Sequence, residues 1–181
     1  MDTSPRTAEL LLKTRSPVVI ASGPELRATH NEAYALLMRN GDGQPPDGVP
    51  LRELSPELWE RAGPLIMQAM LGGQSAVLPD QLFCISRNGC AGETYLTICC
   101  DPIVEDGRRA GVMISLIETT DQVVGARRTA TLREVAAASA GARSVGDACR
   151  RALEAVSRHP SDVPFALMYV VDTDRRTARL A

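Results

Sequence analysis

Four of the five cysteines gather in one stretch of the sequence, and thiols are the residues here best suited to bind a metal or carry redox chemistry. Cys84, Cys90, Cys99 and Cys100 fall within seventeen positions and are separated by five, eight and zero residues. Zinc sites instead use the paired spacing C-x₂₋₄-C. The spacing favours ordinary buried thiols in strands over a metal or redox centre, and Cys90 is the thiol that we expect to be exposed.

Residues for hydrolytic or acid–base catalysis are sparse. The nucleophile motif G-x-S-x-G does not occur. Glu93, Asp101 and Glu118 fall at expected strand ends, where carboxylates are more often solvated than paired for catalysis. The two histidines, His30 and His159, lie in expected turns or at the surface. The sequence therefore offers no catalytic site, and whether the complete protein is an enzyme stays open.

Composition and charge exclude several classes of protein. The 181 residues carry 20 basic and 22 acidic side chains, a formal net charge of -2, so no strong basic field exists to hold nucleic acid or a membrane surface. No apolar run reaches the roughly 18 residues that span a bilayer. Adjacent strand residues such as Cys99 and Cys100 point to opposite faces and cannot easily form a disulfide. We therefore expect a reduced, cytoplasmic protein.

The first part of the chain alternates short strands and helices. Apolar patterning and turn residues predict a helix over 7–15, strands over 17–21 and 25–30, and a helix over 32–38 capped by Asn31. A second helix starts at Ser55-Pro56 and stops at Gly72-Gly73, and Gly63-Pro64 should split or kink it.

Three strands follow, over 78–87, 93–104 and 108–119. Arg87-Asn88-Gly89 and Glu105-Asp106-Gly107 are typical of tight hairpins, because Asn and Gly supply positive φ angles. Consecutive hairpins indicate an α+β fold with an antiparallel sheet and helices on one face. Residues 112–117 are apolar on both faces of their strand apart from Ser115, so the outer face needs a cover of its own.

The last third of the chain begins with a helical linker. Helices are predicted after Asp121 and from Ser144 to His159, then a strand over 164–171 and a final strand over 177–181 that has no partner. These elements look like the opening of a second, incomplete domain.

The order of elements over residues 15–120 resembles a PAS domain. Motifs that carry the resemblance are Val18-Val19-Ile20-Ala21, Asn31-Glu32-Ala33-Tyr34, Pro56-Glu57-Leu58-Trp59-Glu60, Arg87-Asn88-Gly89, Glu93-Thr94-Tyr95-Leu96-Thr97, Asp101-Pro102-Ile103 and Glu118-Thr119-Thr120. Residues 144–181 are similar to the truncated start of a GAF domain. The expected organisation is an N-terminal helical extension over 1–14, a PAS-like five-stranded antiparallel sheet over 15–120, a helical linker over 121–143 and the partial GAF-like α/β segment.

The resemblance implies a sensory and regulatory module of a bacterial signal-transduction protein, with a sensor histidine kinase as the expected parent. A ligand or dimerisation signal would pass through the C-terminal helix to an output domain elsewhere in the same chain. The alternative is a ligand-free interaction or dimerisation module that controls a phosphatase or a transcription regulator. No cofactor is expected: residues 51–72 contain no cysteine for a LOV-type flavin site, and neither His30 nor His159 is placed to ligate haem.

Two sets of residues are candidates for binding. A small-molecule cavity would be lined by the apolar side chains Trp59, Ile66, Met70, Phe83, Ile85, Leu96, Ile98, Ile114 and Leu116, which could equally fill the core. A homodimer interface would use Leu10 and Leu11 with Val124 and Val135 of the linker, although Arg127 and Arg128 interrupt its heptad pattern.

Overall fold

The computed structural model describes residues 13–38, 45–87, 90–172 and 176–181, with the backbone alone at 86, 87, 90 and 91. The chain divides into two units, Met1–Thr120 and Asp121–Ala181. The predicted helix over 7–15 lies mostly outside the described residues, Leu10 and Leu11 included, and residues 13–16 form a turn and bends rather than helix.

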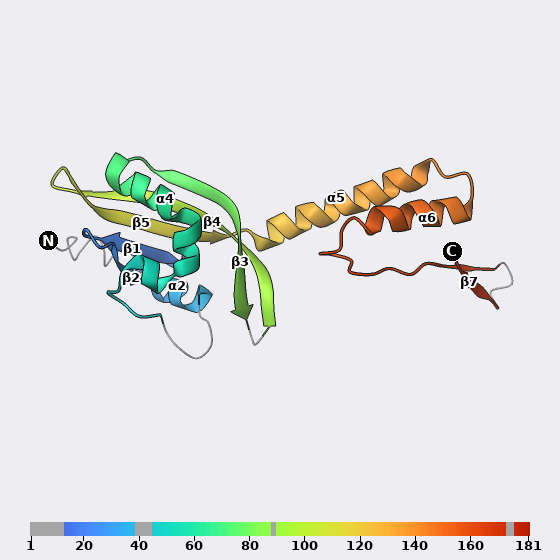
Figure 1. The fold of residues 1–181 in the computed structure, drawn as a ribbon, viewed down its shortest axis with the longest axis horizontal. Helices are drawn as coiled ribbons and strands as arrows, with labels where there is room; N and C mark the ends of the chain where they lie inside the picture. Colours follow the sequence, from blue (N-terminus) through green and yellow to red (C-terminus); the bar gives the residue numbers. More distant parts are fainter. Residues whose placement is uncertain (1–12, 39–44, 88–89, 173–175) are drawn as a thin grey trace. The chain divides into compact units, whose positions relative to one another are not determined.

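The first unit is built on a five-stranded antiparallel sheet (Figure 1). Its strands are β1 (Val18–Ser22), β2 (Arg27–His30), β3 (Ala76–Arg87), β4 (Cys90–Glu105) and β5 (Arg108–Glu118), and they lie in the order β2-β1-β5-β4-β3. The predicted strands and the tight turn at Asp106-Gly107 are confirmed; these two residues adopt φ of 48° and 71°. The α+β, PAS-like fold class is therefore confirmed.

Among the described residues between β2 and β3 are three helices: α2 (Glu32–Leu37), α3 (Leu51–Leu54) and α4 (Pro56–Gly72). Asn31 caps α2, as predicted, by accepting a hydrogen bond from the Tyr34 amide at 2.9 Å. Gly73 ends α4 in the left-handed conformation, with φ of 69°. Of the split or kink predicted at Gly63-Pro64, the split is wrong and the kink stays a prediction: α4 runs through Pro64, because Ile66 and Ala69 beyond it are fully buried and packing outweighs the lost backbone hydrogen bond.

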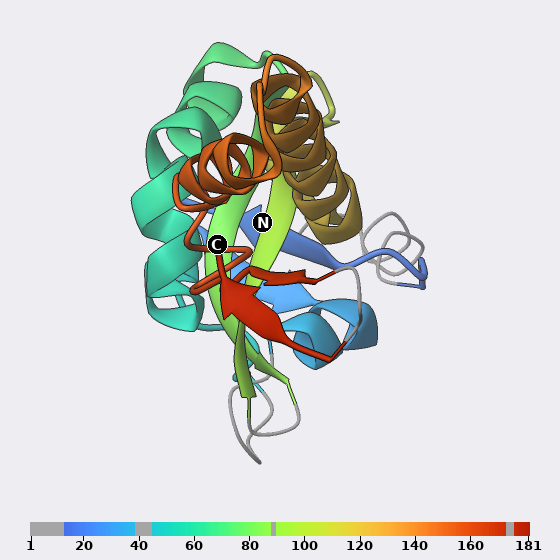
Figure 2. The same cartoon turned by 90° about the vertical axis from the view of Figure 1, so that its right-hand side faces the viewer.

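Alternation along the strands separates two apolar faces. Val19 and Ala21 of β1 join the main core, where α2, α3 and α4 cover the inner face of the sheet (Figure 2). Val18 and Ile20 point the other way and cluster with Ile103, Ala110 and Met113 on the outer face. The helices thus lie on one face, as expected, and the outer face carries its own apolar cluster.

The second unit contains two helices and a β-hairpin. Helix α5 spans Thr120–Ala140 and α6 spans Val145–Val156, with Ser144 capping α6 through the Asp147 amide at 3.1 Å. Strand β6 covers only Tyr169–Val171 of the predicted 164–171. Strand β7 (Ala178–Leu180) is not unpaired as predicted, because hydrogen bonds between Asp172 and Thr177 close a turn that pairs it with β6.

The β6–β7 hairpin should be the least protected sheet of the chain. A two-stranded hairpin is marginally stable in water, and Tyr169, Val171 and Leu180 are each more than half exposed. We expect its amides to exchange with solvent at least about a hundredfold faster than those of β4 and β5. Hydrogen–deuterium exchange with mass spectrometry measures this directly. Equal protection in a dilute sample would contradict the prediction.

Candidate functional site

The nine side chains predicted to line a cavity all meet in the inner core. Ile66 of α4 and six strand residues are buried, and Trp59 and Met70 pack against them from the side. The strand residues are Phe83, Ile85, Leu96, Ile98, Ile114 and Leu116. The structure therefore brings the whole predicted set together; ligand binding among them stays a prediction.

A buried polar pair lies in the same core and was not among the predicted site residues. The Tyr34 side chain is 1% exposed, and its hydroxyl makes no well-formed hydrogen bond with the described residues. Burial raises the pKa of Tyr34, and the neighbouring Ser55 hydroxyl offsets part of that rise. Ser55 is itself 5% exposed, and its side chain does not cap α4, although the sequence placed it at the start of that helix. An unsatisfied buried hydroxyl can anchor a water or the polar group of a ligand.

Tyr34 could have been found from its position. It follows the helix cap Asn31 by three residues, and its neighbour Ala35 is also buried, which identifies the inward side of α2. Ser55 could not have been found from the sequence, because its proximity to Tyr34 depends on how α2 and α4 pack.

The junction between β5 and α5 is tied to the neighbouring strands. The Thr119 amide donates to the Tyr95 carbonyl at 2.8 Å, and the Tyr95 amide donates to Thr120 Oγ1 at 2.9 Å. Thr119 Oγ1 donates to Asp80 Oδ1 at 2.7 Å, where Asp80 occupies a β-bulge with φ of 50°. Strands β3 and β4 thus hold the first residue of α5 in place.

The cysteines occupy different environments, as strand alternation requires. Cys100 is buried on the inner face, where burial raises the pKa of its thiol to about 12. Cys99 is half-buried on the opposite face, and Cys84 is exposed. The side chain of Cys90, predicted to be exposed, lies outside the described side chains. Among the described residues, no group of three or more His, Cys, Asp or Glu could hold a metal ion.

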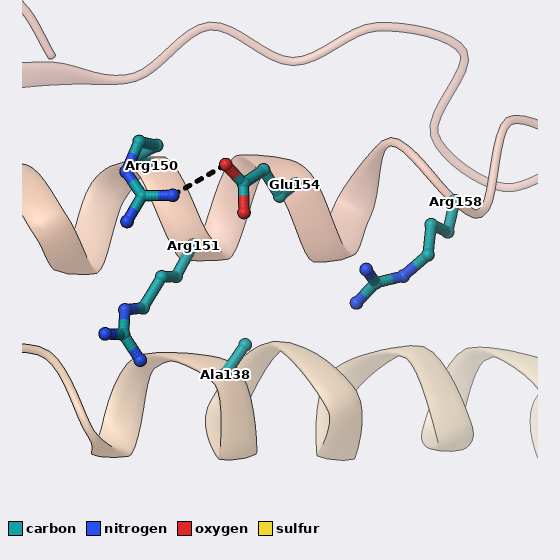
Figure 3. A pocket seen from close by; sticks show the side chains of 5 residues that line it. All are labelled: Ala138, Arg150, Arg151, Glu154 and Arg158. Carbon is teal, nitrogen blue, oxygen red and sulfur yellow. Dashed lines mark hydrogen bonds and ion pairs between the residues drawn. The ribbon is translucent and has the colours of Figure 1, made fainter.

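An arginine-lined cavity of about 250 Å³ lies between α5 and α6 within the second unit (Figure 3). Its guanidinium groups are already matched to carboxylates: Arg150 to Glu154 and Asp147, Arg151 to Asp147, and Arg158 to Glu134. Hydrogen bonds from Arg151 and from His159 lower the pKa values of Asp147 and Glu134, respectively. The pairs at Asp147 and Glu154 lie within α6, whereas those of Arg158 and His159 with Glu134 fasten the segment after α6 to α5.

The four predicted interface residues are only partly described. Val124 and Val135 are half-buried on α5, whereas Leu10 and Leu11 lie outside the described residues. The Arg127 that interrupts the heptad pattern forms two hydrogen bonds to Asp162, at 2.7 and 2.9 Å, which hold the pKa of that carboxyl below its usual range. Arg127 therefore stabilises the second unit. The interface role of the other residues stays a prediction.

Comparison with known proteins gives structural likeness alone. No protein-family model matches the chain, and no curated protein matches it. A sensory box sensor histidine kinase from Vibrio cholerae is 19% identical with a TM-score of 0.44, over 62% of this chain and 89% of that one. The PAS domain of Bordetella pertussis BvgS is 18% identical with a TM-score of 0.43, over 73% and 98%. A Rhodobacter sphaeroides LOV protein is 11% identical with a TM-score of 0.48, over 92% and 100%.

Such likenesses concern the course of the backbone, and the PAS-like fold of this chain rests on its own strand order and helix placement. No helix in the described part of the chain is long and apolar enough to cross a membrane.

Proposed function

We propose that this chain is a sensory module of a bacterial signalling protein, in which the PAS-like unit controls an output domain through α5. The observation that carries the proposal is the junction at Thr119 and Thr120, where β5 passes into α5 without a flexible loop. Because two neighbouring strands hold this junction, a displacement of the sheet would move the start of the helix.

The signal would enter at the inner core. Helix α4 packs on β3, β4 and β5, so a small molecule that separates α4 from the sheet would displace the strands that hold Thr119 and Thr120. The Tyr34 hydroxyl and Ser55 would supply polar anchors among the apolar side chains.

The output proposed is that of a sensor histidine kinase, with residues 144–181 as the start of a GAF-like domain between sensor and output. The support is the sequence resemblance described above. The coding sequence beyond Ala181 tests this part: a phospho-acceptor histidine segment and an ATP-binding domain are expected there. A phosphatase or a DNA-binding domain in their place would contradict the kinase assignment.

A second candidate function is a ligand-free dimerisation or interaction module. It is favoured by the outer face of the sheet, which carries the apolar cluster of Val18 and Ile20. The side chains of Val77, Leu82 and Ile117 on the same face are 59%, 40% and 53% exposed. A homodimer through this face would carry the signal as a change in subunit packing.

Chemical shifts of the α5 amides test the transmission directly. The Ile66→Val variant removes one buried methyl group from α4 and costs about 1 kcal/mol of stability, which leaves the fold intact. The amide signals of residues 121–124 should shift in this variant. Leu36→Ala, an exposed position 62% accessible on α2, is the matched control and should leave those signals unchanged. A response confined to α4 and the sheet would contradict the proposal.

The purified protein should show no haem or flavin absorption, because we propose a module without a prosthetic group. Both ring nitrogens of His30 lie against backbone carbonyls, those of Asn31 and Pro45, at 3.2 and 3.1 Å, and His159 is bonded to Glu134 at 2.7 Å. Both nitrogens of the His30 imidazole are thus occupied, and His159 belongs to the second unit rather than to the PAS-like unit. An absorbance spectrum from 350 to about 600 nm checks this, and a Soret or flavin band in stoichiometric amount would contradict it.

A further inference from the structure

A surface cavity of about 290 Å³ lies at the edge of the inner core, between the β1–β2 turn and helices α3 and α4. Its apolar lining comes from Leu26 of the turn, Leu51 of α3, and Trp59 and Met67 of α4. The rest of the lining consists of Pro24 and two charged residues, Glu25 and Arg52. A volume of this size holds a molecule with a single ring rather than a peptide.

The apolar walls are fixed by neighbouring contacts. Leu51 is fully buried and donates its amide to the Leu26 carbonyl at 2.9 Å, which ties α3 to the turn. Trp59 lies against Gly63, where an added Cβ would be 3.2 Å from the indole ring. The absence of a side chain at Gly63 lets the indole lie close along α4. The cavity therefore presents a preformed aromatic surface.

The charge at the edge of this cavity is not balanced. The Glu25 carboxylate is matched by Arg27, whose Nη2 lies 2.7 Å from Glu25 Oε2. The Arg52 guanidinium is exposed and makes no hydrogen bond or ion pair with the residues that the structure describes. The uncompensated charge beside the apolar walls is thus positive, and a guanidinium offers paired donors that match a carboxylate.

We propose that this cavity binds a small monocarboxylate with a flat apolar ring. The ring packs on Trp59 and Met67, and the carboxylate accepts hydrogen bonds from Arg52. The site borders the inner core, because Leu26, Leu51 and Trp59 also pack in that core, but it opens at the surface and needs no ligand within the core. It therefore does not depend on the proposed function and would add a second input to the module.

Benzoate is the probe, and the indole N–H signal of Trp59 is the reporter, because Trp59 is the single tryptophan of the chain. Titration of the full chain with benzoate should shift this signal saturably. Benzamide has the same shape without the charge and should bind about tenfold more weakly, since it loses the charge-assisted hydrogen bonds. Equal affinity for the two compounds, or no shift with benzoate, would overturn the proposal.

Variants of Arg52 test whether this residue binds the carboxylate of benzoate. Arg52→Gln should weaken benzoate binding about tenfold, and Arg52→Lys, which keeps the charge without the planar fork, should fall between. Arg15→Gln removes an exposed arginine of the segment before β1, which does not line the cavity, and should bind benzoate as the parent does. Unchanged binding by Arg52→Gln, with the remaining amide signals in place, would overturn the assignment. Tyr34→Phe should leave benzoate binding unchanged, because the Tyr34 hydroxyl does not line this cavity. This variant therefore distinguishes binding here from binding within the inner core.

Discussion

Replacement of Gly111 by alanine should cost about 3 kcal/mol of stability, a large share of the total for a unit of this size. Gly111 lies opposite Ser22 in the β1–β5 pair, and a Cβ at this position would be 2.5 Å from the Ala21 carbonyl oxygen. The contact is with backbone, so no side chain can rotate away and the strands must separate. Strands β2 and β1 join the sheet only through β5, and separation would therefore detach both from the described sheet.

Urea unfolding followed by Trp59 fluorescence measures this loss as a lower midpoint. Gly92→Ala is the matched control, because it lies in β4 with open space where its Cβ would stand. It should be neutral or slightly stabilising, since alanine restricts the unfolded chain. The same midpoint for Gly111→Ala and the parent would contradict the packing described for β1 and β5.

Replacement of Asn31 by alanine should cost about 2–4 kcal/mol. The side chain is 3% exposed, and its Oδ1 accepts from the amides of Val18 and Tyr34 at 3.0 and 2.9 Å. Its Nδ2 donates to the carbonyls of Thr14 and Ser16 at 3.1 and 2.7 Å. Alanine would leave these groups without their partner while also removing the cap of α2.

Asn31→Ser separates the two roles of this side chain. Serine can still cap α2, which is worth about 1 kcal/mol, but its shorter side chain cannot bridge to the segment before β1. Thermal unfolding should therefore rank the parent above Asn31→Ser, and Asn31→Ser above Asn31→Ala. Equal stability of the serine variant and the parent would show that the bridge to Thr14, Ser16 and Val18 contributes nothing.

Local patterns in the sequence were sufficient for most of the PAS-like sheet. Alternation of apolar residues predicted the bounds of β3, β4 and β5 to within a few residues. Asp106-Gly107 identified a turn that needs two positive φ angles. The cap of α2 followed from Asn31 and the first-turn acid Glu32. Each of these features depends on residues close together in the chain, where propensity and turn chemistry decide.

Features that depend on contacts between distant segments could not be predicted. The bridge from Asn31 to Thr14 and Ser16 and the approach of Thr119 to Asp80 join segments 15 or more positions apart. The cavity beside Arg52 combines a turn with two helices, and it uses Trp59, which also packs against the inner core as expected. The continuous α4 shows the same limit, because tertiary packing outweighed the local effect of Pro64.

Transmission from the inner core to α5 can be tested by comparing the effect of Ile66→Val on the amide spectrum in two backgrounds. Ile66→Val is measured in the parent and in a Thr120→Val background, where valine keeps the shape of threonine but cannot accept the hydrogen bond from the Tyr95 amide. Ile66→Val should shift the signals of residues 121–124 in the parent and should largely fail to shift them in the Thr120→Val background. Equal shifts in the two backgrounds would contradict the role assigned to the Thr120 junction.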